Sequence, residues 1–167
     1  MENAYHPEAW HELYVALCGA CAALAGLLFI ATSLNGETLI DSKILRSRAG
    51  FNTFLIVFLV VEAALVLVPQ GRIALSVELL VLIALLVPIY IWGIVLLRRA
   101  GFRRLPPRAY VVPATAIVGI MGALSLAFGA GGGMYIVTFF FLAQLAFVMW
   151  NAWGLLLAAK ATEQAAK

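Results

Sequence analysis

The sequence predicts an all-α integral membrane protein, and this prediction rests on composition, long apolar runs and the distribution of charge. Hydrophobic residues make up 65% of the 167 positions, charged residues make up 11%, and the mean hydropathy is +1.04. In soluble domains about a quarter of the residues are charged. A bilayer offers the backbone no hydrogen-bond partners, so apolar runs that cross it form helices. We therefore expect one membrane domain over residues 1–167, built as a helical bundle.

Five apolar runs are long enough to be transmembrane helices. They cover residues 10–34, 51–68, 73–97, 109–128 and 134–158. A helix rises about 1.5 Å per residue, so about 20 residues cross a hydrocarbon core of about 30 Å. No basic cluster precedes the first run, so we expect it to remain as a span and not to be cleaved as a signal peptide.

Basic residues predict the orientation of the five spans. Of the 11 Lys and Arg residues, only Arg72 falls on one side of the membrane when the spans alternate in direction. Cytoplasmic loops carry an excess of Lys and Arg. The N-terminus is therefore predicted outside and the C-terminus in the cytoplasm, and we expect a bacterial inner (plasma) membrane. An even number of spans would break this sorting of charge.

The first and fourth spans carry small residues at helical spacing. Gly19 and Ala23 lie four residues apart in the first span and Gly26 extends the pattern, while Gly119 and Ala123 form a similar ladder in the fourth. Small residues at this spacing let two helices approach closely. We expect these positions to be helix-packing sites, and the two spans could pack together. Because such faces need partners, a homo-oligomer is expected.

The first span also contains both cysteines of the chain, Cys18 and Cys21. Two cysteines separated by two residues occur in redox pairs and in soft-metal sites. A quinone-linked thiol oxidoreductase is therefore one alternative function. Enzymes of that kind also use a second, external cysteine pair, which this chain lacks. The small residues around the two cysteines favour a packing role.

Two basic connections are predicted on the cytoplasmic side. Residues 35–50 have the pattern of a short amphipathic helix lying on the membrane surface. Residues 98–108 form a basic loop that we expect to contact anionic lipid. Its arginines are Arg98, Arg99, Arg103, Arg104 and Arg108. Because topology alone requires such a loop, nucleic-acid binding is not expected.

The second and third spans form a hairpin, and each carries one carboxylate. Counted from the turn, Glu62 and Glu78 lie at a similar depth, about 10 Å below the outer surface. A charged group in hydrocarbon is costly, so both side chains should face the bundle interior. We expect the two acids to share a niche in which at least one exchanges a proton near neutral pH. Alternatively, they are protonated and join neighbouring helices by hydrogen bonds.

Polar residues near the outer ends of the other spans could complete a pocket with these acids. They are His11, Glu12, Tyr14, Ser125, Thr138 and Gln144. Oxygen ligands and one imidazole suit a proton or a divalent cation. The candidate ion-binding or proton-binding residues are Glu62, Glu78, Glu12, His11 and Gln144. Both histidines of the chain lie near its N-terminus, so we expect no haem, di-iron centre or other cofactor.

These observations favour an ion or proton channel or transporter over an enzyme. A carboxylate pair in the outer half of the membrane is the main reason. The alternative is a non-catalytic membrane subunit or regulator of a larger complex, bound through the small-residue faces and the basic loops. Catalytic signatures for serine or cysteine chemistry are absent. The glycine run at residues 129–133 lacks the following Lys and Ser or Thr of a phosphate loop, so we expect a tight external turn there.

Overall fold

The computed structural model describes residues 2–34, 36, 42–99 and 107–165, and within these residues the chain is helical without any strand. The elements in order are η1 (Glu2–Tyr5), η2 (Pro7–Trp10), α1 (His11–Leu34), α3 (Lys43–Leu67), α4 (Arg72–Arg99), η3 (Pro107–Tyr110), α5 (Val111–Phe128) and α6 (Gly133–Ala165). The predicted all-α class is confirmed.

Five helices are long and apolar enough to cross a membrane. Their candidate spans are Pro7–Leu34, Leu45–Leu67, Arg72–Val95, Val111–Phe128 and Gly133–Ala158. This number agrees with the five runs found in the sequence. Length and composition together suggest an integral membrane protein.

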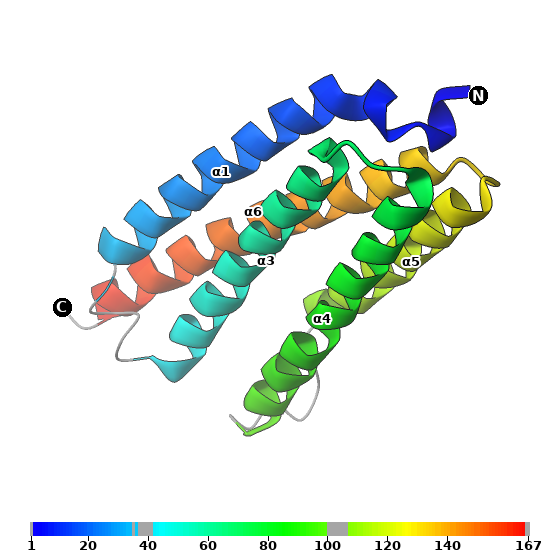
Figure 1. The fold of residues 1–167 in the computed structure, drawn as a ribbon. Coiled ribbons are helices and arrows are strands. Elements are labelled where there is room, and N and C mark those ends of the chain that lie inside the picture. The colour runs from blue at the N-terminus through cyan, green and yellow to red at the C-terminus, as the bar shows by residue number, and fades with distance from the viewer. Residues whose placement is uncertain (1, 35, 37–41, 100–106, 166–167) are drawn as a thin grey trace.

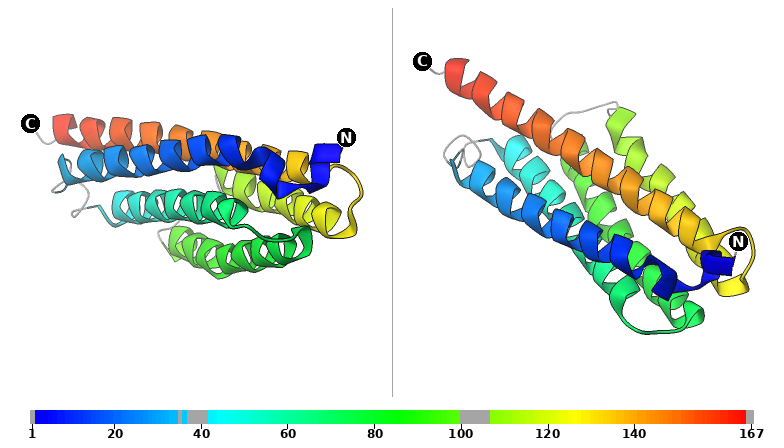
Figure 2. Two further views of the ribbon diagram at one scale, coloured as in Figure 1. Left: turned by 45° about the horizontal axis from the view of Figure 1, so that its top comes forward. Right: turned by 90° about the horizontal axis from the view of Figure 1, so that it is seen from above.

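Helix α3 packs against α1, α4 and α6, and α5 packs between α4 and α6 (Figure 1). Consecutive long helices run in opposite directions, so η1 and the end of α6 lie at opposite ends of the bundle (Figure 2). The sequence left open that the first and fourth spans pack together, and among the described residues α1 and α5 do not form one of the main helix contacts. Helix α1 packs along α3 instead, because the small residues of α1 face away from the bundle.

One end of the bundle is formed by the connections at residues 68–71 and 129–132, and we name it the turn end. Gly129 adopts a left-handed conformation (φ 67°) that ends α5, and Gly131 and Gly132 also have positive φ. Only glycine adopts such angles without steric cost. The N-terminal segment covers this end, where the Tyr5 hydroxyl accepts a 2.9 Å hydrogen bond from the backbone N–H of Gly132.

The opposite end, where α3 begins and α4 and α6 finish, is named the basic end. Helix α3 begins here at Lys43, and Ser42 caps it by accepting a 3.4 Å hydrogen bond from the backbone N–H of Leu45. Residues 43–50 therefore extend the second span and do not form a separate surface helix, which corrects the prediction for this segment. The cause is packing, because Leu45 and Ala49 are buried in a cluster with Leu155 of α6. Residues 35 and 37–41 of the predicted segment lie outside the described residues.

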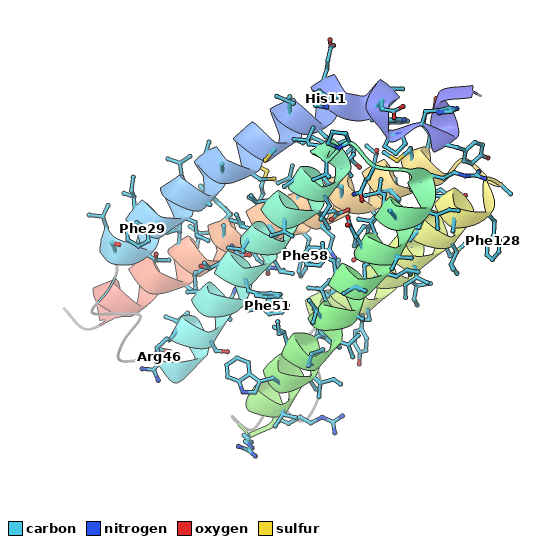
Figure 3. The ribbon with its side chains drawn as sticks, in the orientation of Figure 1. His11, Phe29, Arg46, Phe51, Phe58 and Phe128 are labelled. Atoms are coloured by element: carbon cyan, nitrogen blue, oxygen red, sulfur yellow. The ribbon has the colours of Figure 1, made fainter. Side chains whose placement is uncertain are left out.

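Large apolar side chains cover the outside of the bundle as well as its core. Phe58 of α3 points inward and is 3% exposed, whereas Phe29 and Phe128 point away from the bundle and are 73% and 79% exposed (Figure 3). Trp150 and Trp153 of α6 are also exposed. Soluble monomers rarely carry such an extensive apolar surface. The surface is therefore suited to contact with lipid.

Candidate functional site

Glu62 lies in α3 close to the turn end, five residues before the helix ends at Leu67. Its side chain is fully buried, and neither carboxyl oxygen has a hydrogen-bond partner among the described residues. The residues one turn before and after it, Phe58 and Val66, are also buried, and the Phe58 ring lies edge-on to Phe140 of α6 at 6.5 Å. An unpaired buried carboxylate is far more costly than the neutral acid. The site therefore favours a carboxyl group that carries its proton.

Side chains of α1 and α6 enclose Glu62 with α3. The hydroxyl groups of Tyr14 and Thr138 lie 3.2 Å apart and share a buried hydrogen bond. The Tyr14 ring also packs edge-on against Phe141, with ring centroids 5.7 Å apart. Glu62 lies within electrostatic range of the Tyr14 hydroxyl and the Cys21 thiol. The niche thus combines one acid with two hydroxyl groups and one thiol.

Glu78 lies elsewhere on the hairpin and has a partner of its own. The side-chain amide of Gln70 donates a 2.7 Å hydrogen bond to Glu78 Oε2 and a 2.9 Å bond to the carbonyl oxygen of Leu65. Glu62 and Glu78 are at similar distances from the turn along their helices, as expected. They are nevertheless not hydrogen-bonded to each other, because the Glu62 oxygens are unpaired. The structure does not bring the two acids into one bonded pair.

A cleft of about 220 Å³ opens at the turn end, between the N-terminal segment and the connection from α3 to α4. Its lining residues are Pro7, Glu8, His11, Val66, Leu67, Val68, Pro69 and Gln70. Two lining residues are close in sequence to the niche, because His11 is one helical turn from Tyr14 and Val66 is one turn from Glu62. Val66 thus places the cleft about 6 Å from Glu62 along the axis of α3. Glu12 is exposed and lies outside this lining.

The remaining polar candidates are dispersed. Gln144 of α6 is buried, and its amide has no hydrogen-bond partner among the described residues. Ser125 does not reach the niche, because its hydroxyl bonds to the carbonyl oxygen of Ala130 in the glycine turn. The part of the chain that the structure describes contains no group of three or more His, Cys, Asp or Glu residues that could hold a metal ion.

Cys18 and Cys21 are free thiols in α1. Cys21 is fully buried, whereas Cys18 is partly buried. The redox interpretation of this pair stays a prediction. Both cysteines lie in α1, the helix that packs along α3.

The two small-residue ladders have different environments. A Cβ atom added at Gly119 would lie 2.9 Å from Ile83 Cδ1 and 3.0 Å from the Phe140 ring, and Ala123 is fully buried. Helix α5 therefore makes close contacts inside the chain. In α1, by contrast, Gly19, Ala23 and Gly26 are exposed, and nothing lies within 4 Å of a Cβ atom added at either glycine.

Basic candidates are found at the basic end. Arg98 and Arg99 end α4 with exposed side chains. Arg103 and Arg104 lie outside the described residues, and Arg108 falls in the short helix η3. The lipid contacts predicted for these arginines stay a prediction.

The structure adds two polar residues that were not among the predicted site residues. Gln70 donates a hydrogen bond to Glu78. Asn52 of α3 is buried, and its amide has no partner among the described residues. In the sequence Asn52 stands out only as a neutral polar residue within an apolar run. Which face of α3 is buried could not be read from the sequence, because apolar residues surround the helix on every side.

No protein-family model, curated protein sequence or solved structure matches this chain. Its function is therefore inferred from the chemistry of its own residues.

Proposed function

We propose that this chain is a five-span integral membrane protein of a bacterial inner membrane, with its N-terminus outside and its C-terminus in the cytoplasm. The apolar outer surface and the length of the five helices support insertion. Charge supports the orientation, since Arg46, Arg98 and Lys160 are exposed near the basic end. Cytoplasmic loops are enriched in such residues, which would meet anionic lipid headgroups there.

The orientation can be tested with single cysteines in a chain carrying Cys18→Ser and Cys21→Ala. A cysteine at Ala130 should react in intact cells with a maleimide that does not cross the membrane. A cysteine at Arg98 should react only after the cells are opened. The reverse pattern would contradict the proposed orientation.

Within this membrane protein, Glu62 binds a proton during proton conduction or transport. The observation that carries the proposal is a fully buried carboxyl group without any described hydrogen-bond partner, one helical turn below a cleft. Ionisable groups inside membrane proteins are costly and typically belong to proton or ion pathways. Water in the cleft would bring the proton to the acid, with Glu8 and His11 at the entrance. This function requires binding and release but no catalytic step.

A proton fits this niche better than a metal cation. Divalent cations are held by about six or more oxygen ligands, or by several nitrogen and sulfur ligands. Around Glu62 the described polar groups are the hydroxyls of Tyr14 and Thr138, which are bonded to each other, and the Cys21 thiol. One carboxyl group is sufficient to bind a proton.

The proposal is tested by reconstituting the protein into liposomes that contain a pH-sensitive dye. A potassium gradient with valinomycin supplies the driving voltage. Wild-type protein should admit protons well above the rate of empty liposomes, and Glu62→Gln should reduce the rate at least tenfold. Glu78→Gln is the matched control and should retain most of the flux, because Glu78 is bonded to Gln70.

Two results would overturn the proposal. One is a wild-type flux equal to that of empty liposomes under both signs of voltage. The other is equal flux in wild type and Glu62→Gln, which would show that the protons bypass the buried acid.

A second candidate function is that of a non-catalytic membrane subunit. It is favoured by the exposed face of α1, where Gly19, Ala23 and Gly26 leave room for another helix. A stoichiometric partner protein that copurifies from native membranes, together with absence of flux, would support it. A second copy of this chain on that face would instead support the homo-oligomer expected from the small-residue ladders.

A further inference from the structure

Two buried amides, Asn52 and Gln144, are unexplained by the niche around Glu62. Asn52 is 2% exposed, Gln144 is 1% exposed, and neither side-chain nitrogen nor oxygen of either residue has a hydrogen-bond partner among the described residues. An amide offers two N–H donors and a carbonyl acceptor. Buried polar groups are nearly always bonded, and ordered water supplies the bond where protein does not.

Helices α3 and α6 pack against each other, and we name their contact the α3–α6 seam. Its register places both buried amides along it. The helices are antiparallel, and three contacts define their register. Phe58 faces Phe140, Leu45 packs with Leu155, and a Cβ atom added at Gly154 would lie 3.6 Å from the Arg48 guanidinium. Descending from the turn end, one therefore meets Glu62, then Gln144, then Asn52.

The spacing of these residues follows from the helix rise. Glu62 is four residues above Phe58, and Gln144 is four residues below Phe140, so they are roughly 10 Å apart along the bundle. Asn52 is six residues below Phe58 and thus lies a few Å beyond Gln144. The three residues whose buried side-chain atoms lack partners among the described residues are Glu62, Gln144 and Asn52. They follow one seam through the middle of the bundle.

We propose that the α3–α6 seam is a proton path in which Gln144 and Asn52 hold a transient chain of water molecules. The inference rests on the proposed function of Glu62 and extends it to a complete route and to the proton as the transported species. The protonated Glu62 first releases its O–H proton to a chain of water molecules that reaches Gln144, which leaves a carboxylate. The carboxylate then takes a proton from a hydronium ion on the cleft side, which restores the neutral acid.

In this path the amides neither gain nor lose protons. Each O–H bond formed on one water is matched by an O–H bond broken on its neighbour. Water bonded to Asn52 continues the chain from Gln144 towards the basic end. A hydrated metal cation could not follow, because a gap of roughly 10 Å between polar side chains offers too few oxygen ligands to replace its water shell. The seam thus selects for protons.

The flux assay described above tests the path with Gln144→Leu and Asn52→Leu. Each variant should lower proton flux at least tenfold. Thr115→Val is the matched control, because the hydrogen bonds described for its hydroxyl go to carbonyl oxygens of its own helix α5, and its flux should equal that of wild type. Melting in detergent checks that each variant is folded.

Two further measurements separate this path from the function of Glu62. An apolar carbodiimide, which modifies protonated buried carboxyl groups, should label Glu62 in Gln144→Leu as in wild type. In a chain with Cys18→Ser and Cys21→Ala, a cysteine at Gln144 should react with a small water-soluble thiosulfonate. A cysteine at Ala123, buried between α5 and its neighbours, should not.

The possible failures are distinguishable. If Glu62→Gln abolishes flux while Gln144→Leu and Asn52→Leu conduct normally, the seam is not the path and the role of Glu62 stands. If the wild type carries no flux, the proposed function fails and the path fails with it. If the cysteine at Gln144 is as unreactive as the cysteine at Ala123, water does not enter the seam and the path is overturned whatever the flux.

Discussion

The hydroxyl groups of Tyr14 and Thr138 lie 3.2 Å apart and link α1 to α6 beside the buried Glu62. These residues are 124 positions apart in the sequence. The bond therefore fixes the first span against the last and closes the niche from two sides. Its contribution can be measured, because each hydroxyl can be removed with little change in shape.

Tyr14→Phe should destabilise the protein by about 0.5–1 kcal/mol, since a hydrogen bond is lost and the Thr138 hydroxyl is left buried without its partner. Thermal melting in detergent measures the effect. Combining Tyr14→Phe with Thr138→Val should cost less than the sum of the single changes. Tyr135→Phe is the matched control, because Tyr135 is 56% exposed, and it should not change the melting temperature. Strictly additive effects of Tyr14→Phe and Thr138→Val would show that the two hydroxyls are not coupled.

Glu62→Met should leave stability unchanged or raise it by about 1–2 kcal/mol, because an apolar side chain replaces a buried polar group without a described partner. The same variant should lose proton flux. Glu78→Met should do the opposite, lowering stability by about 1 kcal/mol through loss of the Gln70 hydrogen bond while retaining flux. Melting and flux measured on both variants test this contrast. A large loss of stability in Glu62→Met would indicate that the acid is structural.

The sequence was sufficient to predict helix type and number, because the hydropathy of five long runs is a local property. The similar positions of Glu62 and Glu78 along the hairpin could also be counted from its turn. The neighbours of these acids could not be predicted. Helices α3 and α4 are apolar on all sides, so periodicity does not reveal which face meets which helix. The proximity of Tyr14 to Glu62 and the bond from Gln70 to Glu78 depend on helix rotation and on a turn conformation.

The small-residue ladders illustrate the same limit. Their spacing predicted close helix packing, and Gly119 does lie against Ile83 and Phe140. The ladder of α1 has equal spacing but faces outward. Spacing identifies a face that permits close approach, whereas the partner helix is selected by the packing of the whole bundle.

Gly133→Ala should be among the most disruptive small changes in the chain. An added Cβ atom would lie 2.6 Å from the Cα atom and 2.7 Å from the backbone nitrogen of Leu126, so α5 and α6 must move apart. We expect a loss of about 1–3 kcal/mol, measured by thermal melting. Gly26→Ala is the control, since nothing lies within 4 Å of its added Cβ atom and alanine favours helix, so the melting temperature should stay or rise. Equal melting of Gly133→Ala and wild type would contradict this close approach of α5 to α6.

Gly19→Leu distinguishes a free α1 face from one that binds a second copy of the chain. Within one protomer the substitution meets open space, so folding of the monomer should not suffer. If two α1 helices pack through Gly19 and Ala23, the larger side chain forces them apart and should weaken the dimer at least tenfold. Mass measurement by light scattering in mild detergent, over a range of protein concentrations, reports the change. Phe29→Leu, on the exposed surface of the same helix, controls for added or removed apolar area. An oligomer that survives Gly19→Leu unchanged would assign its interface to another helix, because a close contact at glycine cannot accommodate the added volume.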